Sequence, residues 1–294
     1  MDITEYLKKN RGIVNKALIE YLPKARNISA ELTDAMRYSI AAGGKRLRPI
    51  LMIATAEMFD KKPGRVLQAA CAVEYVHTST LILDDLPCMD NSDLRRGSPS
   101  VHKKFGQSTA ILASYALVAL AFELLMKNAN AVSDDSKLAL DVTESMSDAI
   151  GYKGICAGQY MDLRTGPKKI GLKGLRFLHE HKTADLFVAS CRIAGYLSAA
   201  GNAQLKALSD YGKYLGLAFQ AYDDMLSLNK TDRELGKQAK KDINSPNIVN
   251  LFGSDKARGL LKKYSQEAEA ALHIFGSRSD TLKGFIQYVS IRNK

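Results

Sequence analysis

The stretch LKALSDYGKYLGLAFQAYDDML, residues 205–226, decides the fold. Its apolar side chains recur every three or four positions, which is the spacing of one face of an α-helix. The stripe consists of Leu205, Leu208, Tyr211, Leu215, Phe219, Tyr222 and Leu226. A stripe of this length predicts one continuous buried helix within residues 201–228, and it ends beside an Asp-Asp pair.

The same helical spacing recurs along most of the chain. Further stripes run through residues 30–41, 47–59, 65–84, 107–127, 134–151, 172–199 and 255–274. Turn-forming residues separate them, and alternating β-branched runs, which are the signal of strands, are scarce. The sequence therefore predicts one all-α domain, residues 1–294, with a core built from several long helices.

Composition indicates a globular protein with an anionic partner. Of the 294 residues, 46% are hydrophobic, which is enough to bury a large core and excludes a disordered chain. The formal charge of +11 leaves nucleic acid, a membrane surface and a phosphorylated small molecule as candidate partners. Nucleic acid is disfavoured, because the most distinctive basic residues lie beside acidic ones.

Three features predict a cytoplasmic protein. The first residues, MDITEYLKKNRG, lack the apolar segment of a secretory signal. The cysteines do not form a Cys-x-x-Cys pair, which is typical of free thiols in a reducing compartment. The longest apolar run, residues 110–126, contains Ser114, Tyr115 and Glu123 and is short for a membrane span. We therefore expect a buried core helix there and no membrane span.

An acidic cluster follows one of the apolar stripes. Asp84 and Asp85 follow the apolar segment LIL (81–83) at the end of a predicted helix. Pro87 disfavours helical backbone at Leu86, so the helix should end or bend at Leu86. Asp90 can then fold back toward Asp84. His77 lies seven positions before Asp84, which is two turns along the same helix face.

A second acidic cluster closes the stripe within residues 201–228. Gln220 precedes Asp223 and Asp224 by three and four positions, so the three side chains project to one side of a helix. Carboxylates sharing one cavity would repel one another by about 4 kcal/mol per close pair at an effective dielectric constant of about 20. Mg²⁺ or Mn²⁺ would remove this repulsion, because both prefer oxygen ligands and Mg²⁺ is commonly shared with substrate phosphates.

A third pair, Asp134–Asp135, serves as a contrast. It stands at a predicted helix start, where carboxylates cap free N–H groups and favour the helix dipole, so we expect it to be structural.

Basic residues accompany the acidic clusters. Lys45, Arg46 and Arg48 follow the Gly43–Gly44 pair, where the backbone can approach a ligand closely. They suit either a diphosphate clamp or an ordinary basic helix start. Arg95 follows the first cluster closely, in a position to bind phosphate oxygens that a metal leaves free. The segments HKT, GQYMDL and ELGK carry no chemistry of their own beyond surface charge and packing.

These segments together resemble the trans-isoprenyl diphosphate synthases, the chain-elongating prenyltransferases. The resemblance covers nearly the whole chain and is carried, in order, by GGKRLRP, HTSTLILDDLPCMDNSDLRRG, GQYMDL, HKT, FQAYDD and ELGK. It implies a bundle of long antiparallel helices around a deep cavity, the isoprenoid synthase fold, and a homodimer. It also implies Mg²⁺-dependent condensation of isopentenyl diphosphate with dimethylallyl, geranyl or farnesyl diphosphate, giving farnesyl or geranylgeranyl diphosphate.

The resemblance assigns a role to each polar segment. Ligands of a trinuclear Mg²⁺ cluster on the allylic diphosphate would be Asp84, Asp85, Asp90, Asp223 and Asp224. Ligands of the same diphosphate would be Arg95, Lys182 and Lys237. Ligands of isopentenyl diphosphate would be Lys45, Arg48, His77 and Arg96. The developing carbocation would be faced by Thr183 and Gln220.

Product length should depend on the floor of the cavity. Thr80 lies one turn below Asp84, with Ser79 beside it, and the family often has a bulky aromatic residue there. Both residues are small in this chain, which favours a geranylgeranyl over a farnesyl product. Residues on the adjacent helix, such as Tyr115, could block the cavity instead.

Three segments depart from the family pattern. Ser227 stands where a third aspartate is usual, NSPNIVN (244–250) replaces a Gly-Lys-Ser/Thr stretch, and Ser114–Tyr115 replaces Gly-Asp. These departures keep open a catalytically weak subunit that modulates another prenyltransferase. A terpene cyclase is a further alternative, because it shares acid-rich metal motifs, but it needs no second, non-allylic diphosphate site.

Overall fold

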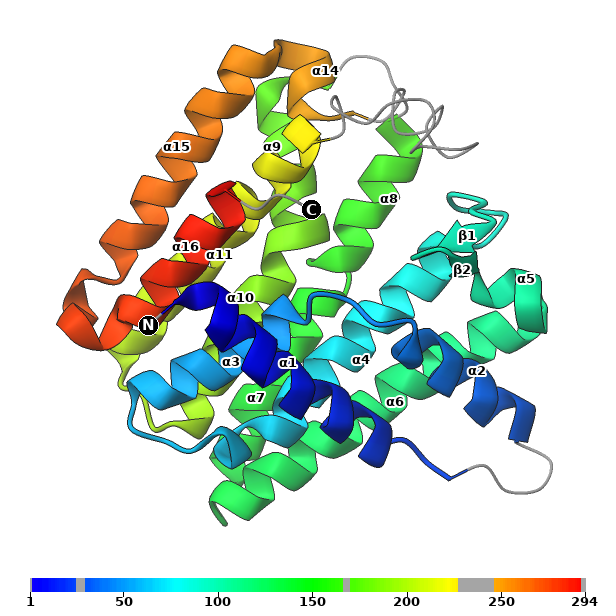
Figure 1. Ribbon diagram of the computed structural model, residues 1–294, viewed down its shortest axis with the longest axis horizontal. Coiled ribbons are helices and arrows are strands. Elements are labelled where there is room, and N and C mark those ends of the chain that lie inside the picture. The colour runs from blue at the N-terminus through cyan, green and yellow to red at the C-terminus, as the bar shows by residue number, and fades with distance from the viewer. Residues whose placement is uncertain (1, 25–29, 166–169, 227–245, 292–294) are drawn as a thin grey trace. The chain divides into compact units, whose positions relative to one another are not determined.

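Helices dominate the part of the chain that the structure describes, which is residues 2–24, 30–165, 170–226 and 246–291 (Figure 1). In this computed structural model, the strands within those ranges are one short antiparallel pair, β1 (Leu94–Arg95) and β2 (Ser98–Pro99). The predicted all-α class is therefore confirmed.

The chain divides into two compact units. The first comprises residues 1–143 and 196–198, and the second comprises residues 144–195 and 199–294. The single domain expected over residues 1–294 stays a prediction.

In the first unit, α4 (Leu67–Asp84) is the central helix. It packs along α6 (Gln107–Val132) and against α1 (Ile3–Glu20) and α3 (Leu47–Met58) (Figure 1). The other elements here are α2 (Ala30–Ala41), η2 (Pro63–Arg65) and α5 (Val101–Phe105). Because α4 is covered from several sides, the acidic cluster at its end stands on a firmly packed helix.

Side-chain hydrogen bonds from α6 hold α4 at its first turn and again near its end. The amide of Asn128 on α6 accepts from the backbone N–H of Ala69 and donates to the carbonyl of Arg65, both at 2.9 Å, so it closes the free start of α4. Further along, the hydroxyl of Ser114 on α6 donates to the carbonyl of Ser79 at 3.1 Å. This bond holds α6 beside the α4 turn that precedes the acidic cluster.

In the second unit, α11 (Asn202–Leu226) is the central helix. It packs along α15 (Ser254–Ala271) and against α16 (Asp280–Ile291) and the π-helical turn η3 (Glu180–Ala184). The other elements are α8 (Ile155–Thr165), α9 (Leu172–His179), α10 (Asp185–Leu197), α14 (Ile248–Phe252) and η6 (His273–Ser279). Helix α7 (Ser136–Ile150) continues from the first unit into the second.

Helix α6 is apolar around most of its circumference but buried along one face only. It is long and apolar enough to cross a membrane by length and composition alone, a test that core helices of water-soluble proteins also pass. Its opposite face is exposed, and Tyr115 on that face is 77% exposed. The expected buried core helix is thus correct for one face, and Tyr115, one of the residues expected to be able to block the cavity, lies on the exposed face.

Candidate active site

The first acidic cluster lies where α4 ends, just before Pro87. The chain turns back as predicted, because the backbone N–H of Asp90 donates to the carbonyl of Asp84, 2.8 Å away. The N–H of Ser92 donates in the same way to the carbonyl of Asp85 at 3.0 Å. These two hydrogen bonds hold the backbone of the cluster in one compact loop.

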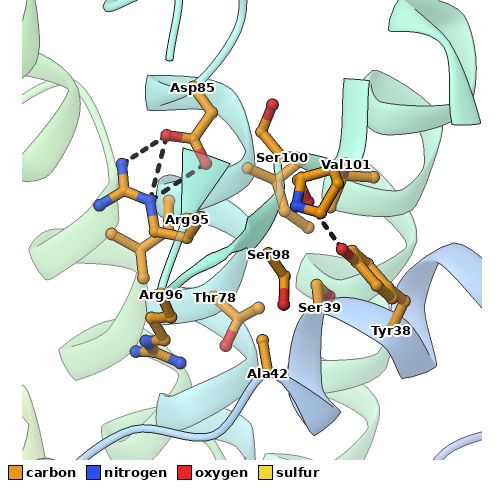
Figure 2. A pocket seen from close by; sticks show the side chains of 13 residues that line it. Tyr38, Ser39, Ala42, Thr78, Asp85, Arg95, Arg96, Ser98, Ser100 and Val101 are labelled. Carbon is orange, nitrogen blue, oxygen red and sulfur yellow. Dashed lines mark hydrogen bonds and ion pairs between the residues drawn. The ribbon is translucent and has the colours of Figure 1, made fainter. Parts of the chain in front are cut away.

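Asp85 is bound by Arg95 and is only 3% exposed. Nε of Arg95 lies 3.1 Å from each carboxylate oxygen, and Nη2 donates to Oδ1 (Figure 2). A two-point pair of this kind fixes the plane of the guanidinium. Burial alone would lower the pKa of Arg95, but Asp85, Asp84 and Asp90 together raise it. Arg95 therefore lies in the field of all three carboxylates of the cluster.

The strand pair that carries Arg95 and Arg96 is fastened to α2. The hydroxyl of Tyr38 on α2 donates to the carbonyl of Pro99 on β2 at 2.8 Å. A small pocket, with Thr78 in its lining, lies between α2, α4 and the strand pair (Figure 2). The hydrogen bond from Tyr38 ties the strand pair to α2, so the segment that carries both arginines is held by a helix that lies outside the acidic loop.

One face of α4 stays partly exposed and carries three of the predicted site residues. His77, Thr80 and Asp84 follow each other at intervals of three and four residues, and each is half-buried. Ser79 is instead buried, and its hydroxyl donates to the carbonyl of Val76 at 2.7 Å. Of the two residues predicted to form the cavity floor, Thr80 is the one that shares a face with Asp84.

Arginines surround His77. Burial lowers the pKa of His77 well below its ordinary value, and Arg48 and Arg96 lower it further. His77 is therefore neutral at physiological pH, and the positive charge of the region comes from the guanidinium groups. A neutral imidazole among several arginines suits an anionic ligand.

Arg96 lies against the Gly43–Gly44 turn. Its Nη1 donates to the carbonyl of Gly43, and a Cβ built on Gly44 would lie 2.8 Å from its Nη2. The φ angle of Gly44 is +138°, a conformation that residues with side chains rarely adopt. The glycine pair thus leaves room for the guanidinium just before Lys45 and the start of α3, which carries Arg48.

Arg46 does not belong to this basic group, so the diphosphate clamp expected for its segment cannot include it. Arg46 is buried, and its Nη1 lies 2.6 Å from Oε1 of Glu74 on α4. Its Nη2 donates to the carbonyl of Ile40 at 2.6 Å, and its Nε donates to Oδ1 of Asn15 at 3.0 Å. All three nitrogens are used within the protein, and together they join the start of α3 to α1, α2 and α4.

In the second unit, Lys182 and Thr183 lie in η3, one turn of π-helix inserted between α9 and α10. Turns of this kind are uncommon and are frequent at functional sites. Nζ of Lys182 lies 2.5 Å from Oδ2 of Asp162 on α8. Lys182, which is predicted to bind diphosphate, is thus held by α8, a helix to which the sequence assigned no chemistry.

A series of hydrogen bonds connects Thr183 to the second acidic cluster. The hydroxyl of Thr183 donates to Oε1 of Gln220 at 2.7 Å, and Nε2 of Gln220 donates to Oδ1 of Asp224 at 2.8 Å. The backbone N–H of Ile248 donates to Oδ2 of Asp224 at 2.8 Å. Because the Thr183 proton is used in this series, the oxygen lone pairs are the part of that side chain left for a ligand.

Asp224 is stabilised by the hydrogen bonds from Gln220 and Ile248. It is 4% exposed, and burial raises its pKa to about 7, against the lowering effect of the bonds from Ile248 and Gln220. Nε2 of His179 lies 3.7 Å from Oδ2 of Asp224. Burial and the charge of Lys182 lower the pKa of His179 to about 4, so this imidazole is neutral.

The two Asp-Asp pairs of the candidate site share one arrangement. In each pair the second residue, Asp85 or Asp224, is buried and receives hydrogen bonds from the protein. The first residue, Asp84 or Asp223, is partly exposed. The first carboxylate of each pair is therefore the more accessible one for a metal ion or ligand.

Asp135 of the contrast pair behaves as predicted. Oδ1 of Asp135 accepts the backbone N–H of Lys137 at 2.9 Å at the start of α7, so this carboxylate caps a helix. The expected capping role is thereby confirmed for Asp135, and the structural role of Asp134 stays a prediction.

Within the described residues, no group of three or more His, Cys, Asp and Glu side chains converges closely enough to hold a metal ion by itself. The metal roles of both acidic clusters, and the cavity that they were expected to share, therefore stay predictions. Lys237 and Ser227 lie outside the described residues.

The sequence did not predict the ion-pair partners of Lys182 and Arg46. Asp162 pairs with Lys182, and Glu74 pairs with Arg46. Both contacts join residues that are far apart in the chain, and a single sequence carries no signal for such a pair. The only available hint was the helical spacing of Gly158 and Asp162, which places a small residue and a carboxylate on one face.

Comparison with known proteins gives consistent results over nearly the whole chain. The family model described as polyprenyl synthetase matches residues 29–271. Geranylgeranyl pyrophosphate synthase 9 of Arabidopsis thaliana, named as chloroplastic, is 39% identical over 99% of this chain and 82% of its own length. The large subunit 1 of a heterodimeric geranylgeranyl pyrophosphate synthase from the same plant, also named as chloroplastic, is 38% identical over 99% of this chain and 80% of its own length.

A solved structure extends this similarity to three dimensions. An FPP/GFPP synthase from Zymomonas mobilis matches with a TM-score of 0.87 and 32% identity, over 98% of this chain and 99% of that one. The isoprenoid synthase fold expected from the motifs is thereby confirmed.

Proposed function

The chain belongs to the polyprenyl synthetase family, and from this premise we propose that it is a short-chain trans-prenyltransferase. It condenses isopentenyl diphosphate with an allylic diphosphate and releases diphosphate. The observation that carries the proposal is the partly exposed face of α4 with His77, Thr80 and Asp84, which has Arg48 and Arg96 near His77. Arginines that can bind an anion thus lie near the face of α4 that carries a carboxylate able to bind a metal ion.

Magnesium fits the oxygen donors of both acidic clusters. The polyprenyl synthetase family generally uses Mg²⁺, and carboxylates are among the ligands that this ion prefers. We assign it to Asp84, Asp85, Asp90, Asp223 and Asp224, with the more exposed Asp84 and Asp223 as the main contacts of their pairs. When bound, Mg²⁺ neutralises charge on the departing diphosphate and so favours ionisation of the allylic C–O bond.

Basic residues of the chain hold the two diphosphates. Arg95, Lys182 and Lys237 bind the allylic diphosphate, and the orientation that Asp85 imposes on Arg95 supports this role. The residues that bind isopentenyl diphosphate are Lys45, Arg48, His77 and Arg96. The neutral state of His77 lets it donate or accept a hydrogen bond without adding charge.

Thr183 and Gln220 stabilise the allylic cation after the C–O bond breaks. The Thr183 hydroxyl donates a hydrogen bond to Gln220, so its oxygen offers lone pairs rather than a proton to a bound ligand. The π-electrons of isopentenyl diphosphate then attack the cation and form the new C–C bond. A proton lost to the released diphosphate completes the five-carbon extension.

Product analysis of the purified chain tests this function. We expect Mg²⁺, isopentenyl diphosphate and dimethylallyl, geranyl or farnesyl diphosphate to give a longer all-trans prenyl diphosphate, and removal of Mg²⁺ by EDTA to abolish it. A cyclic hydrocarbon formed without isopentenyl diphosphate would indicate a terpene cyclase. No elongated product at any Mg²⁺ concentration would indicate the weak modulating subunit. The cytoplasmic location stays a prediction, since both plant relatives are named as chloroplastic.

Product length gives a first prediction. Thr80 lies one helical turn, about 5.4 Å, from Asp84 on the same face, so its small side chain leaves the prenyl chain room to grow toward geranylgeranyl diphosphate. We expect Thr80→Phe to shift the main product to farnesyl diphosphate, measured by chromatography of the dephosphorylated products. Thr80→Val, which keeps the volume, serves as the control and should leave the product unchanged. An unaltered product from Thr80→Phe would remove Thr80 from the cavity floor.

A homodimer is the second part of the proposal. The exposed face of α6 carries Ile111, Leu112, Tyr115 and Met126, an apolar surface that water-exposed helices rarely show. We expect a dimer by light scattering and a shift toward monomer in the Ile111→Glu/Tyr115→Glu variant. Lys16→Glu, on the exposed side of α1, is the control and should remain dimeric. A charged double variant that stays dimeric would place the interface elsewhere.

A further inference from the structure

Helix α8 holds Lys182, although the proposed reaction assigns no task to that helix. Oδ2 of Asp162 lies 2.5 Å from Nζ of Lys182, and both side chains are about three-quarters buried by their exposed fractions of 23% and 27%. The two residues are 20 positions apart, so the pair joins two separate elements, α8 and η3. It therefore differs from the exposed pairs between neighbouring turns of one helix that the second unit also contains.

The backbone of η3 is clamped by glycines on two sides. A Cβ on Gly158 of α8 would lie 2.4 Å from the backbone nitrogen of Lys182, and a Cβ on Gly216 of α11 would lie 2.6 Å from Cα of Ala184. Only glycine permits these approaches, because the neighbouring atoms are backbone atoms that cannot rotate away. Gly158 lies one turn before Asp162, so the close approach and the carboxylate share one face of α8.

Gln159 adds an independent observation on the same helix. Both polar atoms of its side-chain amide, Nε2 and Oε1, are buried and have no hydrogen-bond partner within the described residues. Buried amides are nearly always satisfied, so this amide has both a donor and an acceptor with which a ligand can form hydrogen bonds. Gln159 lies three positions before Asp162, which brings both onto one side of α8.

We propose that Asp162 and Gln159 are a positioning residue and a further binding residue for the allylic diphosphate. Asp162 holds the ammonium group of Lys182 in one orientation before substrate arrives, which removes much of the rotational freedom that a lysine otherwise loses on binding. The Gln159 amide donates its N–H groups to the same ligand. Gly158 lets α8 come close enough for both contacts. This inference rests on the proposed function, because it takes the ligand of Lys182 to be the allylic diphosphate.

Steady-state kinetics test the role of Asp162. We expect Asp162→Asn to raise KM for the allylic diphosphate by about 10–100-fold, by analogy with the loss found when residues that orient the ligands of a metal ion are replaced. KM for isopentenyl diphosphate should stay within about twofold. In the Lys182→Ala background, Asp162→Asn should add less than about twofold, because Asp162 acts through Lys182. Asp210→Asn breaks the exposed Lys206–Asp210 pair on α11 and is the matched control without effect.

Gln159→Leu separates a binding role from a structural one. Leucine has a similar volume and no polar atoms, so thermal stability should be maintained or rise when the unsatisfied amide is removed. The affinity for farnesyl thiolodiphosphate, an analogue that does not ionise, should fall about 10-fold by calorimetry. A residue needed only for packing would show the opposite result, with lower stability and unchanged affinity.

The outcomes are distinguishable from failure of the proposed function. If the unaltered chain makes no elongated product, the proposed function is wrong, and the affinity of Gln159→Leu for the thiolodiphosphate, compared with that of the unaltered chain, still decides the inference. If the unaltered chain is active, three results would overturn the inference: equal increases of both KM values in Asp162→Asn, full additivity with Lys182→Ala, or unchanged analogue affinity in Gln159→Leu. Should Asp162→Asn fail to fold, the Gln159→Leu affinity alone settles the matter.

Discussion

Asp84→Ala is expected to lower kcat/KM by about 10³-fold, the loss typical of removing one group that stabilises charge in the transition state. Asp84 is half-buried on the α4 face that also carries His77 and Thr80, and its partner Asp85 already binds Arg95. Steady-state kinetics at several Mg²⁺ concentrations should show that added Mg²⁺ restores little of the rate.

The fold should survive this change. Asp84 lies near Asp85 and Asp90 in the chain, so removing its charge relieves repulsion among carboxylates, and the melting temperature should be equal or higher. Asp135→Ala is the matched control, because Asp135 only caps α7 and its loss should leave the rate unchanged. A near-normal rate in Asp84→Ala would mean that the metal assignment is wrong.

Glu74→Ala is expected to lower the free energy of unfolding by about 3–5 kcal/mol, which is typical when one partner of a buried ion pair is removed. Glu74 and Arg46 bury nearly their whole side chains, with exposed fractions of 3% and 2%. The variant leaves the guanidinium of Arg46 with only the carbonyl of Ile40 and the amide of Asn15. Denaturant unfolding followed by circular dichroism gives the measurement.

Two further variants sharpen this result. Glu123→Ala breaks the exposed Lys127–Glu123 pair on α6 and should cost less than about 1 kcal/mol. The double variant Arg46→Met/Glu74→Leu should recover much of the loss, because an apolar pair needs no desolvation of charge. A loss below about 1 kcal/mol in Glu74→Ala would show that water reaches Arg46.

Most long helices could be predicted from periodicity, because one face of each packs on a core. The stripe within 201–228 became α11, and the stripe 30–41 coincides with α2. Helix α8 was missed, because it is short and its one fully buried residue is Gly158, so it has no stripe of large buried apolar side chains. The π-helical turn η3 lies within the stripe 172–199 and was not predicted from it. Its backbone packs closely against Gly158 and Gly216, and the spacing of apolar residues gives no sign of such a contact.

The sequence motifs of the candidate site could be predicted, but the ion-pair partners of its residues could not. Periodicity and Pro87 were enough to predict the return of Asp90 toward Asp84, because that turn is local. The partner of each arginine was not predictable. Arg46 and Arg48 stand two positions apart in the same basic segment, yet Arg46 forms a buried ion pair with Glu74, whereas Arg48 is the arginine with the largest effect on the pKa of His77. Only the three-dimensional packing of α1, α2 and α4 separates the two.

The contact of Arg96 with the Gly43–Gly44 turn has a consequence for protein engineering. The guanidinium of Arg96 occupies the volume that a Cβ on Gly44 would take. The segments that carry these two residues therefore constrain each other's sequence. A chimaera that imported residues 43–48 from a relative without residues 94–99 would combine surfaces that never adapted to one another. Loop grafting intended to alter specificity for the five-carbon donor should therefore transfer both segments as one cassette.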